Sequence, residues 1–270
     1  GYGLSLADEL KSLEVLRAAA QVHPLEIVPT FLGAHDVPAE HRGDKARYVD
    51  LLVEELLPAV AAARLAEYCD VFTEAHTFDL ADSRRILGRA RELGFGLRVH
   101  ADQLSQLGGA ELAAELGAAS ADHLEHVSER GIAALLAAGT VPVLCPLVPL
   151  VLRQEREAPG RRIADAGLPL ALSTDYNPGS CYCPSLHEAI AFGALRYRLT
   201  AAECLTAATL NPACSLGRGA RCGTLEPGKQ ADFALLDVAS VEHLAYDFGR
   251  PRVRGVWKRG VRVVPAPAAG

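Results

Sequence analysis

The sequence predicts an α/β fold with a parallel sheet, built as part of a (β/α)8 barrel. Short apolar runs of strand length alternate with longer helical patterns up to about residue 200, as consecutive strand-helix-strand units do. Three of these runs lead into His100, His123 and Asp175. Because the carboxyl ends of the strands form the catalytic face of such a barrel, these three side chains are expected to point into one mouth.

The alternation can be followed element by element. The strand candidates are the apolar runs 25–31, 69–74, 95–100, 121–124, 140–145 and 168–174. The helical patterns span 5–20, 44–67, 79–93, 109–118, 128–138, 153–166 and 184–198. Ser5 is a suitable cap for the first helix, Pro58 is expected to break the second, and Gly94 ends the third. Six strands are too few to close an eight-stranded barrel.

The pattern changes after residue 199. A helix over 200–210, a helical turn at 211–213, a strand over 232–236 and a hairpin of 253–257 and 261–264 are predicted there. The hairpin turn is placed at Arg259-Gly260. These strands suit a small antiparallel β element, so we expect a partial barrel domain over 1–205 and a small β domain over 206–270. The final PAPAAG is expected to be disordered.

Composition excludes several classes of protein. The 270 residues carry a net charge of −6, which gives no electrostatic reason to expect nucleic acid or an anionic membrane as a partner. No apolar run approaches the ~20 residues that a membrane span needs, and no signal peptide is visible. The seven scattered cysteines are interpreted as reduced thiols of a cytosolic protein. The chain has no methionine, so we expect a processed or truncated piece.

His100, His123 and Asp175 are the candidate metal-binding and catalytic residues. Neutral imidazole is a common ligand of zinc and iron, and rigid strand ends suit a fixed coordination geometry. Each residue also has a plainer interpretation: a capping histidine, a polar residue at a helix start, and an acid in an Asx turn. In the order His, His, Asp on strands of one sheet, the three together are much more specific than any one alone.

Two more histidines follow predicted strands. His35, in FLGAHDVP, could bind an anionic or carbonyl-bearing substrate, or it could be a solvated loop residue. His76, in TEAHTF, has no resolved role. The sequence lacks the G-x-S-x-G elbow of serine hydrolases and the glycine-rich motifs of nucleotide-binding sites.

These residues lie in stretches that resemble a known family. TFLGAHDVP, the run from His100 to His126, and LSTDYNPGS resemble the imidazolonepropionases of the amidohydrolase superfamily. The likeness extends over essentially the whole chain, including NPACSLG and GTLEPGKQADFALLD. It implies a TIM-like (β/α)8 barrel of the metal-dependent hydrolase type with a small β-sandwich element, of which strands 3 to 8 of the barrel are present here.

The resemblance also implies residue roles. His100 and Asp175 would ligate one zinc or iron ion per subunit, and Asp175 would also transfer protons. His123 would contact the attacking water or the reacting carbonyl. Gln103 would act at the reaction centre, although its amide cannot transfer the proton that a glutamate found there in some members could. The implied substrate contacts are Tyr2, His35, Gln103, Asn177, Gly179 and Ser180.

The implied reaction is hydrolysis of 4-imidazolone-5-propanoate to N-formimidoyl-L-glutamate in histidine degradation, by a cytoplasmic homodimer. Members of the superfamily carry an H-x-H pair of metal ligands on the first barrel strand, and this sequence has no H-x-H. Two alternatives therefore remain. The chain could belong to another cyclic amidohydrolase or a deaminase, or it could be an inactive fragment that lacks those ligands.

Overall fold

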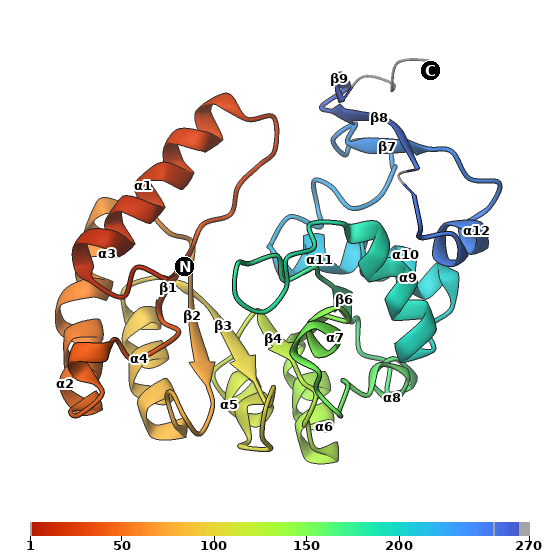
Figure 1. The fold of residues 1–270 in the computed structure, drawn as a ribbon. Coiled ribbons are helices and arrows are strands. Elements are labelled where there is room, and N and C mark those ends of the chain that lie inside the picture. Colours follow the sequence, from red (N-terminus) through yellow and green to blue (C-terminus); the bar gives the residue numbers. More distant parts are fainter. Residues whose placement is uncertain (1, 251, 265–270) are drawn as a thin grey trace. The chain divides into compact units, whose positions relative to one another are not determined.

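The computed structural model describes residues 2–250 and 252–264. The chain divides into two compact units, Gly1–Pro142 and Val143–Gly270, and Figure 1 labels their elements. The boundary falls inside a strand, so the predicted division at 205 and 206 stays a prediction. The PAPAAG tail lies outside the described residues. No helix in the described ranges combines the length and the apolar character needed to cross a membrane.

The N-terminal unit alternates strands and helices. Its strands are β1 (Thr30–Ala34), β2 (Tyr68–Thr73), β3 (Gly96–Ala101), β4 (Ser120–His123) and the start of β5 (Val141–Leu144). Its helical segments are α1 (Leu6–Val22), η1 (Ala39–His41), α2 (Lys45–Leu51), η2 (Leu52–Leu56), α3 (Leu57–Ala63), α4 (Leu80–Glu92), α5 (Gly109–Glu115) and α6 (Glu129–Ala138). The pairs β1–β2, β2–β3 and β3–β4 are all parallel. The predicted parallel strand-helix architecture is confirmed.

The two faces of β2 and β3 differ in polarity, because successive side chains of a strand point to opposite sides. On one face the buried Cys69, Val71 and Val99 pack toward α4 and α5. The Thr73 hydroxyl on this face donates a hydrogen bond to Ser83 of α4 at 2.8 Å. The opposite face carries charged and titratable groups, among them His100, and the register of the strands decides which of them meet.

The C-terminal unit contains the rest of β5, paired in parallel with β6 (Ala171–Leu172). Its helices are α7 (Val148–Leu152), α8 (Gly160–Asp165), α9 (Leu186–Tyr197), α10 (Ala201–Ala207), α11 (Leu210–Ser215) and α12 (Val241–Tyr246). A separate antiparallel sheet has the order β7 (Phe233–Leu236), β8 (Val253–Lys258) and β9 (Val261–Val264). Its hairpin turns at Arg259 and Gly260, which have φ values of 51° and 77°, as a tight hairpin requires.

Several predicted elements differ from the observed ones in their bounds. The predicted strand 168–174 is reduced to β6, Ala171–Leu172. The first strand begins at Thr30 instead of 25, because Pro29 cannot donate to a ladder. Within the predicted helix 153–166, only α8 (Gly160–Asp165) is helical. The preceding helix α7 ends at Leu152, before the predicted range begins, because Arg153 adopts a left-handed φ of 55°. Pro58 does not break its helix. It lies in the first turn of α3, directly after the π-helical segment η2. The helix α12 was not predicted.

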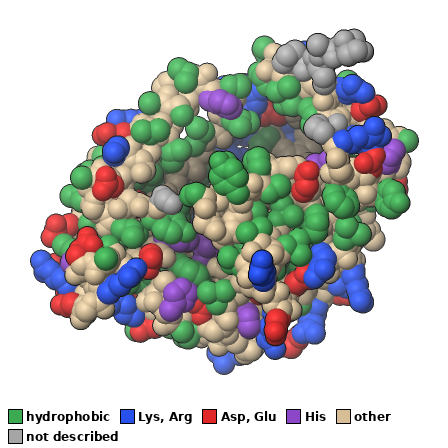
Figure 2. All heavy atoms as spheres, viewed as in Figure 1, with side chains coloured by type: hydrophobic (Ala, Val, Ile, Leu, Met, Phe, Trp, Pro, Cys, Tyr) green, Lys and Arg blue, Asp and Glu red, His purple; other side chains and the backbone are tan. Residues whose placement is uncertain are grey.

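Charged side chains of both signs lie near one another on the surface, and Figure 2 shows them interspersed along much of its lower edge. Exposed ion pairs include Arg85–Asp50 at 2.6 Å and Arg89–Glu92 at 3.0 Å. Pairs of this kind contribute little to stability because solvent screens them. They make the surface mixed in charge, in keeping with the modest net charge of the sequence.

Candidate metal-binding and catalytic site

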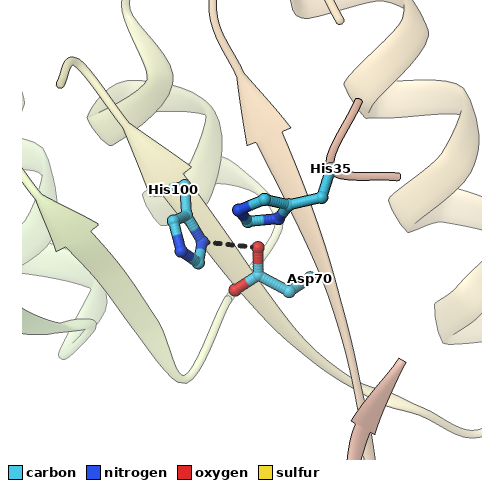
Figure 3. Close-up of side chains that lie close together, drawn as sticks. All are labelled: His35, Asp70 and His100. Carbon is cyan, nitrogen blue, oxygen red and sulfur yellow. Dashed lines mark hydrogen bonds and ion pairs between the residues drawn. The ribbon is translucent and has the colours of Figure 1, made fainter. Parts of the chain in front are cut away.

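His100 lies at the carboxyl end of β3, on the polar face of the sheet. Its Nδ1 is 2.6 Å from Oδ1 of Asp70, a residue of β2 whose side chain is only 2% exposed. Figure 3 shows the imidazole turned toward this carboxylate, with His35 entering from the end of β1. Three neighbouring strands therefore bring His35, Asp70 and His100 together.

An aromatic cluster surrounds His100. The ring centroid of His35 lies 4.4 Å from that of His100, with the two rings nearly perpendicular at 89°. The ring of His123, at the end of β4, lies 5.0 Å from His100. Tyr2 packs against His35 at 4.5 Å. The structure thus brings together four residues that the sequence predicted for the site.

The two outer histidines are held neutral. Burial, with a contribution from the neighbouring His100, lowers the pKa of His35 to about 3, although Asp70 acts in the opposite direction. Burial likewise lowers the pKa of His123 well below its usual value, with His100 and His35 adding to the shift. A neutral imidazole can donate one hydrogen bond and accept another. The arrangement favours binding of a carbonyl group by His35 over binding of an anion by a cationic ring.

Two buried carboxylates hold the loop after β3, where Gln103 lies. Asp102 accepts hydrogen bonds from the backbone N–H groups of 107–110 at 2.8 to 3.1 Å. Glu74, from the loop after β2, accepts from the N–H groups of Leu104 and Ser105 at 2.9 and 3.1 Å and from the Ser105 hydroxyl. Gln103 is 6% exposed and stands between these two anchors. Its backbone is therefore fixed on both sides.

Replacing Glu74 by glutamine is expected to lower the free energy of unfolding by about 1–3 kcal/mol at pH 7, because charge-assisted hydrogen bonds are lost. Burial raises the pKa of Glu74, but hydrogen bonds from Ser105, Ala75 and Leu104 outweigh it, and the pKa lies below 4.5. The carboxylate therefore stabilises the folded state above pH 4.5, and this contribution disappears as the pH falls through the lowered pKa. Urea unfolding of both proteins from pH 7 to pH 3 measures the difference. A difference in unfolding free energy between the two proteins that stays the same at low pH would contradict the prediction.

Several residues at or just after the strand ends have a left-handed backbone conformation. His123 and Leu124 follow one another with φ values of 77° and 72°, Asp102 has 49°, and Asp175 has 48°. Left-handed φ values are uncommon for residues other than glycine, and they cluster at functional sites where the surrounding structure can hold them. The strain at His123 turns its side chain out of the alternation that β4 would otherwise impose.

The remaining predicted residues lie in the C-terminal unit, in the loop after β6. Asn177 organises this loop. Its Oδ1 accepts from the N–H groups of Gly179 and Ser180 at 2.8 and 2.7 Å, and its Nδ2 donates to the Asp175 carbonyl at 2.8 Å. The Ser180 hydroxyl lies 3.4 Å from Oδ2 of Asp175. Asp175, Asn177, Gly179 and Ser180 thus form one compact turn, and their roles toward metal and substrate stay predictions.

The sequence analysis missed Asp70 and Glu74. The signal in the sequence was the run CDVFTE, in which two acids lie among apolar residues. A carboxylate that is buried in this way needs a partner. His76 is exposed and contacts the Phe72 ring edge-on at 5.5 Å. His126 donates its backbone N–H to the Asp102 carbonyl at 2.7 Å. Neither contact assigns these two histidines a chemical role.

The donor set of the N-terminal unit fits a metal ion. His35, Asp70 and His100 each offer a ligand atom, and these atoms lie within 4.8 Å of one another. Imidazole nitrogen and carboxylate oxygen suit zinc and iron alike. His100 therefore has the donor chemistry of a metal ligand and lies among groups that suit a metal site, and the choice of metal is not fixed by them.

The sequence is similar to a known family and to known proteins. A profile of the amidohydrolase family matches residues 16–263. An imidazolonepropionase from Symbiobacterium thermophilum is 52% identical over 98% of this chain and 62% of its own length. Another from Solibacter usitatus is 48% identical over 96% of this chain and 62% of its own length. The chain therefore spans somewhat less than two thirds of these curated relatives.

Solved structures share the fold. A zinc-bound adenosine deaminase from Xanthomonas campestris superposes with a TM-score of 0.71 at 22% identity, over 94% of this chain and 64% of that one. A 5-methylcytosine deaminase from Klebsiella pneumoniae, liganded with 5-fluorocytosine, superposes with a TM-score of 0.74 at 19% identity. The match covers 98% of this chain and 68% of the deaminase chain. The parallel strands described above are part of the barrel that these enzymes share. With the family profile covering most of its length, the chain belongs to the amidohydrolase family.

Proposed function

We propose that the protein containing this chain hydrolyses 4-imidazolone-5-propanoate to N-formimidoyl-L-glutamate. The observation that carries the proposal is the 40–52% identity to curated imidazolonepropionases over 96–98% of this chain. The match to the family profile, over residues 16–263, spans the stretch that carries the histidine cluster at the ends of β1, β3 and β4. The reaction adds water across a ring C–N bond, so that the carbonyl carbon becomes a carboxylate and the ring nitrogen takes a proton.

His100 and Asp175 would hold the metal, which is zinc or iron in this proposal, with one ion per subunit. When bound, the ion lowers the pKa of water from 15.7 toward ~7 and so supplies hydroxide at neutral pH. The carboxylate of Asp175 accepts the proton of the attacking water and returns it to the leaving nitrogen. His123, held neutral by burial, donates a hydrogen bond to the carbonyl oxygen as negative charge develops there.

The other predicted residues bind the substrate. His35 and Tyr2 contact the substrate beside His100, and the turn of Asn177, Gly179 and Ser180 contacts the ring or the opened product. Gln103 binds substrate through its amide and holds it against the reacting groups. The protein acts as a cytoplasmic homodimer and has neither nucleic acid nor membrane as a partner in this proposal.

The test is an assay of the full-length protein with 4-imidazolone-5-propanoate, followed by chromatographic detection of N-formimidoyl-L-glutamate. Product formation that depends on added zinc or iron is the expected result. Ammonia release from an aminated ring, with no action on the imidazolone, would assign the protein to the deaminases instead. Absence of turnover and of metal binding would mean that it is not a working hydrolase.

Replacing Gln103 by alanine is expected to raise the KM for the imidazolone about 3–10-fold, the effect of losing one hydrogen bond to an uncharged group. Gln106, an exposed residue of the same loop, is the matched control, and Gln106→Ala should leave KM unchanged. Steady-state kinetics of the two variants against the parent protein measure the effect. Equal KM values for all three proteins would remove Gln103 from the substrate site.

A further inference from the structure

Asp70 occupies a position where a carboxylate needs a specific partner. It lies in the middle of β2, its side chain is 2% exposed, and it shares the polar face of the sheet with His100. Burial of a charged carboxylate is costly unless the charge is paired and hydrogen-bonded. The residue paired with it across the ladder is Arg98, whose guanidinium lies over the Tyr68 ring and donates to Ser120 at 2.8 Å. The imidazole of His100 lies within hydrogen-bond distance of the Asp70 carboxylate.

This contact selects one tautomer of His100. Oδ1 of Asp70 and Nδ1 of His100 are 2.6 Å apart. An ionised carboxylate only accepts hydrogen bonds, so Nδ1 must carry the proton. In a neutral ring the proton on Nδ1 leaves the lone pair on Nε2, and Nε2 is then the nitrogen that can ligate a metal.

Direct coordination by Asp70 fits the distance less well. Two ligand atoms at about 2.1 Å from one tetrahedral ion would lie about 3.4 Å from each other. The 2.6 Å between Oδ1 and Nδ1 is a hydrogen-bond distance, and it is too short for two ligands of one tetrahedral zinc ion. Oδ1 of Asp70 and Nδ1 of His100 therefore do not ligate one ion together, which leaves Nε2 of His100 as the nitrogen for the metal.

We propose that Asp70 is the positioning residue of the metal site, which holds His100 as the Nδ1–H tautomer with Nε2 presented to the metal. The inference rests on the proposed function only in taking His100 as a metal ligand. It adds a residue that touches neither metal nor substrate. Carboxylates that orient a ligating histidine typically contribute 10–100-fold to metal affinity or activity.

The first experiment reads the tautomer in the metal-free, full-length wild-type protein. Histidine labelled with 15N is incorporated, and the ring signals of His100 are assigned by their loss in His100→Gln. A protonated Nδ1 and an unprotonated Nε2 are expected, and their couplings to the ring protons distinguish the two. A proton on Nε2 would overturn the proposal. This measurement needs no variant of Asp70, so a folding defect in such a variant cannot obscure it.

The second experiment measures zinc affinity by competition with a chelator for wild type, Asp70→Asn and Asp70→Ala. Both substitutions are expected to weaken binding about 10–100-fold while His100 remains present. Asp122→Asn is the matched control, because Asp122 lies on the polar face and pairs with His100 across β3 and β4. Its zinc affinity should stay within about threefold of wild type.

Unchanged zinc affinity in both Asp70 variants would overturn the positioning role. A loss in Asp122→Asn as large as in Asp70→Asn would also overturn it, because another acid beside His100, without the hydrogen bond to Nδ1, would then have the same effect. Neither readout uses the imidazolone. If the protein fails to hydrolyse that substrate but shows the expected tautomer and affinities, the proposed function is wrong and the role of Asp70 stands.

Discussion

Replacing His100 by alanine is expected to reduce bound zinc or iron from about one ion per subunit to a trace and to lower turnover more than about 1,000-fold, equivalent to about 4 kcal/mol of transition-state stabilisation. The imidazole is held by Asp70 at 2.6 Å and stands between the rings of His35 and His123. Its removal takes away the proposed metal ligand and also leaves the buried carboxylate of Asp70 without that contact. Metal analysis of the purified full-length protein, followed by the imidazolone assay, measures both effects.

The control for this experiment is His76→Ala. His76 is exposed in the loop after β2 and contacts Phe72 by its ring edge, so its loss should change neither metal content nor turnover. If His100→Ala keeps a full complement of metal, His100 is not a ligand. If His76→Ala loses metal as well, the assignment of ligands in this unit is wrong.

Replacing Asp102 by alanine is expected to lower the free energy of unfolding by more than about 3 kcal/mol. The side chain is fully buried and accepts four backbone N–H groups, of Leu107, Gly108, Gly109 and Ala110. Each buried donor left without an acceptor costs about 1–3 kcal/mol. Asp102 also has a φ of 49°, a conformation that alanine adopts less readily than aspartate or asparagine. Denaturant unfolding of the full-length variant measures the loss.

Asp102→Asn serves as the matched variant. Asparagine tolerates the left-handed backbone and keeps one oxygen, and the Oδ1 position accepts three of the four hydrogen bonds. Asp102→Asn should lower the free energy of unfolding by about half as much as Asp102→Ala, or less. A stability of Asp102→Ala within about 1 kcal/mol of wild type would show that water replaces the carboxylate at little cost.

Much of the fold followed from local pattern. The spacing of apolar residues predicted strands near 69–74, 95–100 and 121–124, and the structure places β2, β3 and β4 there. Prediction failed where proline decided the boundary. Pro29 delayed the first strand, whereas Pro58 was accommodated in the first turn of a helix after a π-helical segment. Such outcomes depend on which backbone groups are paired, and that is a tertiary property.

The candidate site was predictable only in part for the same reason. A histidine at the end of a strand can be found in the sequence, as His100 and His123 were. The contact between Asp70 and His100 depends on the register of β2 against β3, in which Phe72 and not Asp70 stands opposite His100. The engagement of Asn177 with its own loop depends on backbone conformation. Neither is encoded in the spacing of residue types.

The convergence of four amides on Asp102 also fixes how many residues the loop can contain. Adding one residue between Asp102 and Ala110 would move each N–H by one position and rotate the start of α5 by about 100°. The carboxylate would then face side chains where it now faces donors. We therefore expect the segment that carries Gln103 to tolerate changes of residue type far better than the insertion or deletion of a residue.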